Sequence, residues 1–301
     1  MHDRASFAAI GAAMRRPLFK LNGTRALVVA AALTATGGAA LFAKAESAGG
    51  LLFDRYGRLA AFPGKEETAC PSQDARTAVI LAAGQSNIAN HAAAPAKTSF
   101  PDKVFGFYDE RCAPAASPLL GATNIGGEWL TLLGDALIRS GRYDKVVIAP
   151  ASVGGQPIFR FAEGDLGVML DETATKLAGR YRVTHVIWHQ GESDYAGETG
   201  PDAYRAMFLK IVARLRAKGM AAPVFVSVAT YCPPMREWKN GNAIQTAQRA
   251  LADERLGVWP GVDSDAFDPG SNRSDDCHFS AAGQAKMAEA QAKLILDRAP
   301  R

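Results

Sequence analysis

The sequence predicts an α/β fold with three layers: a doubly wound, mostly parallel sheet of five strands with helices on both faces. From Thr77 onward, apolar runs alternate with amphipathic segments that have helical periodicity. Several of the apolar runs are rich in Val and Ile without polar alternation, which is typical of strands buried on both faces. Helices between such strands imply right-handed crossovers, so we expect the sheet to lie between two helical layers.

The strands and helices can be assigned in chain order. We expect strands at residues 78–83, 104–108, 145–150, 184–188 and 224–230. We expect helices at residues 129–140, 166–181, 201–218, 242–252 and 281–297. No internal repeat or low-complexity linker interrupts this pattern. Residues 77–301 are therefore expected to form one domain with a well-buried core, and residues 46–76 an N-terminal extension.

Residues 1–45 have the composition of an export signal. Their first 25 residues carry five basic side chains against one acid, and an uncharged stretch follows at residues 26–43. Ala43-Lys44-Ala45 places small residues at the spacing that a signal peptidase accepts. We therefore expect export to the periplasm or cell exterior with cleavage after Ala45, the alternative being a signal anchor retained at residues 26–43. Arg15 and Arg16 also resemble a twin-arginine signal, so the export route stays open.

The basic charge of the chain belongs to this leader. Residues 1–45 hold six Lys/Arg and one Asp, a net charge of +5, whereas the whole chain carries +4. The remainder is therefore close to −1. A basic surface for nucleic acid is not expected there, and contact with a membrane is expected only through an uncleaved leader.

Four cysteines follow the leader: Cys70, Cys112, Cys232 and Cys277. An even count in an oxidising compartment permits two disulfides, and three pairings are possible. No Cys-x-x-Cys pair occurs, and His185 and His189 lie four residues apart in a strand-like run, which separates them by roughly 13 Å. Neither a metal site nor another cofactor is expected.

Polar turns follow the predicted strands at the edge of the sheet where doubly wound folds place their active sites. Ser86, in Gly84-Gln85-Ser86-Asn87, follows the first strand, where a Gly-flanked hydroxyl can act as a nucleophile. Gly154 and Gln190 lie in the turns after the strands at 145–150 and 184–188. Asp275 and His278 precede the last helix, and their spacing lets the carboxylate reach one imidazole nitrogen while the other faces Ser86.

These groups have the chemistry of serine catalysis. A serine hydroxyl needs a base, the base needs a carboxylate that orients it, and the tetrahedral intermediate needs hydrogen-bond donors. The Gly154 N–H, the Gln190 amide and the Ser86 N–H could supply these donors. A plain alternative exists for each group: a polar turn at Ser86, a helix cap at Asp275 and ordinary loop contacts for the rest.

A second chemical alternative uses Glu192 and Asp194. Both lie near a strand end and could act as paired carboxylates in glycosidic cleavage. Serine catalysis is preferred because it accounts for more of the residues and because no second acidic strand end faces this pair.

The same blocks resemble the SGNH (GDSL-like) hydrolase superfamily, in particular its branch of sialate O-acetylesterases and carbohydrate esterase family 6. The resemblance covers residues 77–296 in the family's order, with the serine first and Asp-x-x-His near the C-terminus. Its most specific part is the run Trp188-His189-Gln190-Gly191-Glu192-Ser193-Asp194. A flavodoxin-like fold is implied, and an ordinary α/β-hydrolase, with Gly-x-Ser-x-Gly and a widely spaced acid and histidine, is not.

The resemblance implies that Ser86 is the nucleophile, His278 the base and Asp275 its orienting acid. It also implies that Gly154 and Gln190 complete the oxyanion hole. Two positions depart from the pattern. Asp276 stands where related sequences often have glycine, so it competes with Asp275 for the role of the acid. Gln156 stands where the branch commonly has Thr or Ser, which bears on substrate contacts.

The implied reaction is the hydrolysis of O-acetyl esters on a glycan or oligosaccharide through an acyl-enzyme, without a cofactor. The alternatives are a lipase or thioesterase of the same superfamily and a non-catalytic glycan-binding protein of the cell envelope. Aromatic side chains could stack on sugar rings, although core packing is their commoner role; the candidates are Trp129, Phe159, Phe161, Tyr195 and Trp238. A Cys232–Cys277 disulfide that braces the loop of the base is a further hypothesis.

Overall fold

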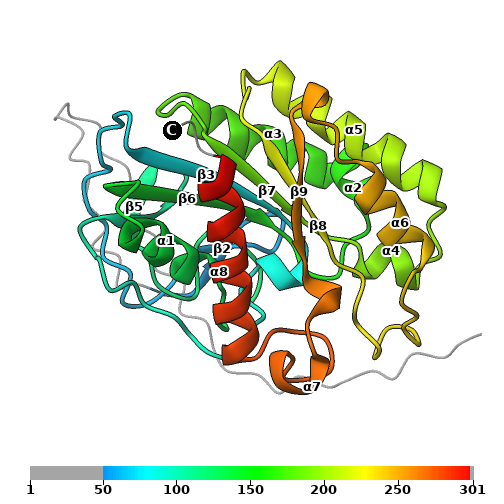
Figure 1. The fold of residues 1–301 in the computed structure, drawn as a ribbon. Coiled ribbons are helices and arrows are strands. Elements are labelled where there is room, and N and C mark those ends of the chain that lie inside the picture. Colours follow the sequence, from blue (N-terminus) through cyan, green and yellow to red (C-terminus); the bar gives the residue numbers. More distant parts are fainter. Residues whose placement is uncertain (1–49, 299–301) are drawn as a thin grey trace, which may run out of the picture. The chain divides into compact units, whose positions relative to one another are not determined.

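A central parallel sheet organises the residues that the computed structural model describes, 50–298, and Figure 1 shows its ribbon. The predicted export signal at residues 1–45 lies outside the described residues. The strand order is β5-β4-β6-β3-β7-β8-β9, and every neighbouring pair is parallel except β4 with β5. The strands are β3 (Thr77–Gly84), β4 (Val104–Tyr108), β5 (Arg111–Pro114), β6 (Lys145–Ser152), β7 (His185–His189), β8 (Val224–Val228) and β9 (Val258–Asp263).

The sheet has seven strands, so the expected number of five is wrong. When β3, β6, β7, β8 and β9 are numbered in chain order, their spatial order is 2-1-3-4-5, the flavodoxin arrangement. The predicted strand at 104–108 is β4, which joins β5 in a hairpin that extends the sheet beyond β6. The hairpin turns through Asp109 and Glu110 with φ of 52° and 63°, a geometry that usually takes Asn-Gly. Strand β9 was missed because Pro260 and Gly261 interrupt its apolar run, and an edge strand tolerates such residues.

The five predicted helices are all present, and their ends lie within three residues of the expected ones. They are α1 (Leu130–Arg139), α3 (Asp165–Ala178), α5 (Pro201–Ala217), α6 (Ala243–Ala250) and α8 (Ala281–Arg298). Short helices that the pattern did not predict lie in the loops: α2 (Ile158–Ala162), α4 (Glu192–Ala196), α7 (Pro269–Asn272) and the 3₁₀ turns η1 (Ser86–Ile88), η2 (Glu254–Leu256) and η3 (Ser264–Ala266). Pro201 suits the first turn of α5, because a proline there lacks an N–H that would find no partner in the helix.

Two helical layers enclose the sheet, as Figure 1 shows with α1 and α8 on one face and α3, α5 and α6 on the other. Strand β3 is completely buried, and its side chains pack in the cores on both faces of the sheet. Val79 and Leu81 belong to the core under α2, α3, α5 and α6, whereas Ala78 and Ile80 belong to the core under α1 and α8. This division follows from the two-residue period of a strand, which sends successive side chains to opposite faces.

The N-terminal extension is held against this domain from residue 50 onward. Its strands β1 (Leu52–Phe53) and β2 (Leu59–Ala61) pair antiparallel. The Leu59 side chain is fully buried, and its N–H donates to the Ala122 carbonyl at 2.9 Å. A disulfide between Cys70 and Cys112 ties the extension to β5.

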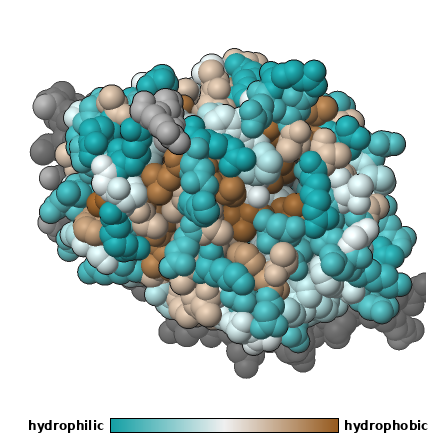
Figure 2. All heavy atoms as spheres, in the orientation of Figure 1, coloured by the Kyte–Doolittle hydropathy of each residue, from teal (hydrophilic) through white to brown (hydrophobic). Residues whose placement is uncertain are grey.

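Among residues 50–298, no helix has both the length and the apolar character needed to cross a bilayer. Figure 2 shows hydrophilic residues over most of the visible face, with hydrophobic residues in patches between them.

Candidate active site

The predicted nucleophile lies at a tightly enclosed turn after β3. Gly84 adopts φ of +142°, and a Cβ at this position would come within 2.0 Å of the His189 carbonyl oxygen, so only glycine fits between β3 and β7. Ser86 begins the 3₁₀ turn η1 and is 6% exposed. Gln85 fastens the turn to the next loop, since its side-chain oxygen accepts the N–H groups of Gly191 and Ser193 at 3.4 and 3.3 Å.

The predicted base and acid meet in the loop before α8. His278 Nδ1 lies 2.8 Å from Asp275 Oδ2, and the other carboxylate oxygen accepts the backbone N–H groups of His278 and Cys277 at 2.6 and 3.1 Å. Burial opposes ionisation of Asp275, but the hydrogen bonds and charge of His278 outweigh it and lower the pKa of the carboxyl below its ordinary value. The Asp275 carboxylate therefore holds the imidazole with Nε2 left over for another partner.

The neighbouring acid has a different role in this loop. Asp276 adopts a left-handed backbone conformation with φ of 58°, which glycine adopts with less strain than a residue with a side chain. Within the residues that the structure describes, its side chain makes no hydrogen bond or ion pair. Of the two candidates, Asp275 is the carboxylate that touches His278.

One contact joins the loop of the predicted base, residues 273–279 (the base loop), to the turn of the predicted nucleophile, residues 84–88 (the nucleophile turn), and two further contacts hold the base loop in place. Asn87, next to Ser86, donates from Nδ2 to the carbonyl of Cys277, next to His278, at 3.2 Å. Arg273 donates from Nη1 to the same carbonyl at 2.9 Å. The hypothetical disulfide between Cys232 and Cys277 is confirmed and ties the loop to the segment after β8. No hydrogen bond joins the Ser86 hydroxyl to another group in the described part of the chain, so the two elements are held through their neighbours.

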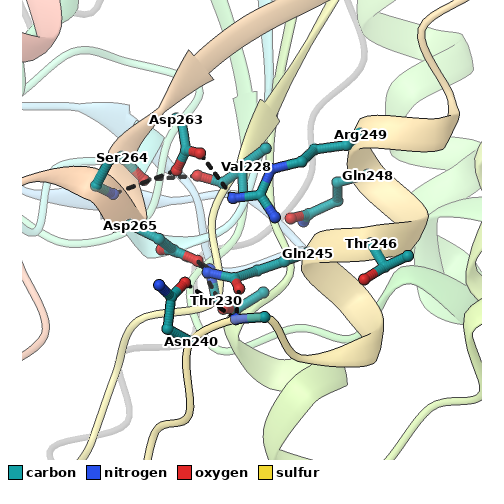
Figure 3. A network of polar contacts seen from close by, with 12 residues as sticks. Val228, Thr230, Asn240, Gln245, Thr246, Gln248, Arg249, Asp263, Ser264 and Asp265 are labelled. Atoms are coloured by element: carbon teal, nitrogen blue, oxygen red, sulfur yellow. Dashed lines mark hydrogen bonds and ion pairs between the residues drawn. The ribbon is translucent and has the colours of Figure 1, made fainter.

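The segment that carries Cys232 is itself braced by a buried carboxylate (Figure 3). Asp265 accepts the Thr230 hydroxyl at 2.6 Å, the Thr230 and Tyr231 N–H groups at 2.9 and 3.0 Å, and the Gln245 side-chain amide at 2.7 Å. The bonds link the ends of β8 and β9 to α6. The disulfide partner of the base loop is therefore attached to the rigid sheet domain.

The predicted oxyanion donors are engaged with protein groups. Gly154 donates its N–H to Thr123 Oγ1 at 2.8 Å. Gln190 is fully buried, and its amide nitrogen donates to Asp194, to the Gln156 carbonyl at 3.1 Å and to the Gln85 side chain at 3.2 Å. Among the described residues, the Ser86 N–H is the predicted donor without an acceptor.

Glu192 and Asp194 act as enclosed acceptors. Glu192 is 2% exposed and accepts from Asn87 Nδ2 at 2.7 Å, and burial raises the pKa of its carboxyl to about 7. Asp194 is fully buried, accepts the Ile158 N–H at 2.8 Å and the Thr199 hydroxyl at 2.7 Å, and has a pKa raised by burial. Both carboxylates serve the protein's own donors, which disfavours the glycosidic alternative.

Sequence reasoning missed a histidine beside the base. The His91 ring stacks on the His278 ring with centroids 5.2 Å apart. A Cβ at Gly154 would lie 2.6 Å from His91 Nε2, so this glycine is needed for the close approach of the ring. Burial, and then the charge of His278, lower the pKa of His91 to about 4. Its place five residues after Ser86 is the only sequence signal, and that spacing alone does not indicate a contact.

The aromatic candidates divide by burial. Trp129 and Phe161 are fully buried core residues, and the Trp129 indole donates to the Asn87 carbonyl at 2.7 Å, which supports the nucleophile turn. Phe159 is 51% exposed. Tyr195 and Trp238 are half-buried. Gln156, the other departure from the pattern, bonds to the Gly154 carbonyl at 3.0 Å and to Arg160. No group of three or more His, Cys, Asp or Glu side chains suited to a metal ion occurs among residues 50–298.

Comparison with known proteins identifies the family of the chain and structures with a similar fold. Residues 76–297 match the family model described as carbohydrate esterase, sialic acid-specific acetylesterase. An Arabidopsis thaliana protein of known structure has the same fold, with a TM-score of 0.61, 18% identity, and coverage of 74% of this chain and 98% of the other. A carbohydrate acetylesterase from Xanthomonas citri matches with a TM-score of 0.49, 19% identity, and coverage of 72% and 55%. One from Sinorhizobium meliloti matches with a TM-score of 0.48, 14% identity, and coverage of 73% and 99%. No curated protein sequence matches this chain.

Proposed function

We propose that this chain removes O-acetyl groups from a glycan or oligosaccharide through an acyl-enzyme on Ser86. The chain belongs to the carbohydrate esterase family of sialic acid-specific acetylesterases and is a carboxylic ester hydrolase. The observation that carries the proposal is the Asp275–His278 pair, with Nδ1 and Oδ2 2.8 Å apart, held to the nucleophile turn through Asn87 and the Cys277 carbonyl. A glycan-binding protein without catalysis would have no use for this pair beside a serine.

The mechanism follows from the groups at the site. His278 Nε2 takes the Ser86 proton as the serine oxygen attacks the ester carbonyl, and Asp275 stabilises the imidazolium that forms. The tetrahedral oxyanion accepts a hydrogen bond from the Ser86 N–H, the expected donor that has no acceptor among the described residues. The other two expected donors, the Gly154 N–H and the Gln190 amide, are bonded to Thr123 and Asp194 in this conformation. The intermediate collapses as His278 returns the proton to the sugar oxygen that leaves. A water molecule, deprotonated by His278, then attacks the acetyl-serine and releases acetate.

The substrate and the location of the protein are parts of the same proposal. Phe159, Tyr195 and Trp238 are accessible enough to stack on sugar rings, whereas Trp129 and Phe161 are not. Two disulfides, Cys70–Cys112 and Cys232–Cys277, support an oxidising compartment and so agree with the expected export signal. We propose a periplasmic or extracellular enzyme that acts on acetylated glycans.

Replacement of the serine tests the proposal. We expect Ser86→Ala to lose hydrolysis of an aryl acetate and of acetylated glycans by about 10⁴-fold or more, and to form no acetyl adduct in mass spectra of quenched reactions. Ser152→Ala is the matched control, because Ser152 is also buried near a strand end and its hydroxyl has no partner in the described residues. Turnover by Ser86→Ala at the control's rate would refute the mechanism. Acetate release from a panel of acetylated sialosides and xylans then identifies the glycan.

A further inference from the structure

Thr123, a residue that the sequence did not indicate, lies against one of the expected oxyanion donors. The Gly154 N–H is not free in this conformation, since it donates to Thr123 Oγ1 at 2.8 Å. The same hydroxyl oxygen lies 3.1 Å from His91 Nε2. The Gly154 backbone nitrogen and the His91 ring nitrogen therefore both contact the Thr123 hydroxyl. The direction of the hydroxyl hydrogen depends on whether the His91 nitrogen donates or accepts.

The His91 tautomer follows from Asn124. The Asn124 side-chain oxygen accepts the Ile125 N–H at 2.9 Å, which identifies the other terminal atom as the amide nitrogen. That nitrogen lies 3.2 Å from His91 Nδ1. It can only donate, so Nδ1 must accept and the proton of a neutral ring must sit on Nε2. The lowered pKa of His91 agrees with a neutral ring.

The Thr123 hydroxyl therefore accepts two hydrogen bonds. A hydroxyl oxygen has two lone pairs and one hydrogen, so donation by Gly154 and His91 uses both lone pairs. The hydrogen must point away from these donors, and no acceptor receives it among the described residues. Thr123 is only partly exposed, so this is a fixed donor rather than a freely rotating surface hydroxyl.

The pairing of the strands places this donor beside the nucleophile turn. Ala122, just before Thr123, bridges to Ser152, and Ser152 pairs with Gly84, two residues before Ser86. Thr123, Gly154 and the Ser86 turn thus follow one another along the carboxyl edge of the sheet. On the same side, the His91 ring that holds Thr123 lies against the His278 ring.

We propose that Thr123 is a further catalytic residue, whose O–H donates to the acyl oxygen in the transition state while the Gly154 N–H acts through it. This inference rests on the proposed esterase function. As negative charge develops on the acyl oxygen, the hydrogen bond from the Thr123 hydroxyl to that oxygen becomes shorter and stronger. The Gly154 N–H and the His91 Nε2–H polarise the hydroxyl by donating to its oxygen. No proton is transferred and no bond is broken at Thr123.

Thr123→Val is the decisive variant, because valine keeps the shape of threonine and removes the hydroxyl. We expect kcat to fall by about 10²-fold with KM nearly unchanged, since the bond strengthens only in the transition state. Thr123→Ser, which keeps the hydroxyl, should remain within a few-fold of the natural enzyme. An increase in kcat for Thr123→Val would overturn the proposal, because it would mean that Thr123 merely competes for the Gly154 N–H. An unchanged kcat would also overturn it.

A second variant covers the case in which Thr123→Val does not fold. His91→Phe keeps a ring against His278 but deletes the Nε2–H donor, and His91→Gln keeps a donor near that place. We expect His91→Phe to lower kcat several-fold and His91→Gln to restore most of the loss. Equal kcat values for the two variants would contradict the proposal that the His91 N–H acts through the Thr123 hydroxyl. Addition of Ser86→Ala to Thr123→Val should abolish the remaining turnover. Residual turnover that survives this addition would refute the proposed function itself, whatever Thr123 does.

Discussion

The nucleophile turn and the base loop are held in place by different means. Ser86 is 6% exposed and follows a strand that pairs with a parallel neighbour on each side, so the sheet itself positions it. His278 and Asp275 lie in a loop where the acid's side chain is 56% exposed. This loop depends on the Cys232–Cys277 disulfide, on Arg273 and on Asn87. We therefore expect the position of Ser86 to tolerate the loss of distant contacts, whereas the position of His278 depends on a few individual ones.

Within the base loop, the largest effect is expected from replacement of Asp275. Asp275→Asn keeps an oxygen for the backbone N–H groups but replaces the charge that holds the His278 tautomer, so kcat should fall by about 10⁴-fold. Asp276→Asn is the matched control and should retain most of the activity. The measurement is kcat for an aryl acetate with both variants. Equal losses would show that the Asp275–His278 contact does not orient the base.

The two disulfides give the next test, because they close loops of similar length. Their sequence separations are 45 for Cys232–Cys277 and 42 for Cys70–Cys112, and removal of either should cost up to about 4 kcal/mol of stability. Only loss of Cys232–Cys277 should also lower kcat, by up to about 10²-fold, because it releases the base loop. Paired Cys→Ser variants, compared by denaturant unfolding and by kcat below the unfolding transition, measure both effects. Similar kcat values for the two variants would mean that the base loop does not depend on its disulfide.

Glu192 gives a pH-dependent effect on the nucleophile side. Its carboxyl has a pKa of about 7 in the folded protein against an ordinary value of 4.5, so the folded state retains a proton that the unfolded state has lost. The contribution of Glu192 to the free energy of unfolding is therefore fully present below pH 4.5. It falls by about 3 kcal/mol as the pH rises to 7. Glu192→Gln cannot ionise, so it should match the natural protein in stability at pH 4.5 and exceed it at pH 8.

Denaturant unfolding at the two pH values checks this prediction. Glu289→Gln is the control, because it makes the same change of side chain at a position that is exposed on α8. Since other titrating groups such as His189 and His91 are common to all three proteins, the difference between the curves isolates Glu192. A stability gain that is the same at both pH values would contradict a protonated Glu192.

The smallest effect is expected at Asp276. Its φ of 58° is unfavourable for a residue with a side chain, so Asp276→Gly should raise stability by up to about 1 kcal/mol, less the entropy that glycine adds to the unfolded chain. We expect kcat to stay unchanged, in contrast to Asp275→Gly. Thermal unfolding and kcat of the two variants give the comparison, and a large loss of activity in Asp276→Gly would make this residue part of the site.

Much of the fold could be predicted because its signals are local. The apolar runs of β3, β6, β7 and β8 and the periodicity of the five long helices are visible in short windows of sequence. Strand β9 escaped because Pro260 and Gly261 break its pattern, and β5 escaped because it has only four residues. Strand order is decided by pairings between distant segments, so the hairpin at the β6 edge had no local signal.

Ser86, Gly154, Gln190, Asp275 and His278 were visible in the sequence as polar turns at predicted strand and helix ends. The contact between Asp275 and His278 could also be predicted, since the two residues are three apart. The remainder of the site depends on long-range contacts: the choice of cysteine pairs, the stacking of His91 on His278 and the bond from Gly154 to Thr123. None of these has a characteristic spacing, because each joins loops that follow different strands.

Residue types and short spacings were enough to identify the alternation of strands and helices, the candidate groups for serine catalysis and the family to which the chain belongs. Those properties depend on residue type and short spacing, which a linear chain already contains. The folded structure was needed to show which acid touches His278, which donors already have acceptors and where the seven strands lie. Such properties depend on backbone conformation and on distances between segments, and these arise only when the sheet brings the ends of its strands together.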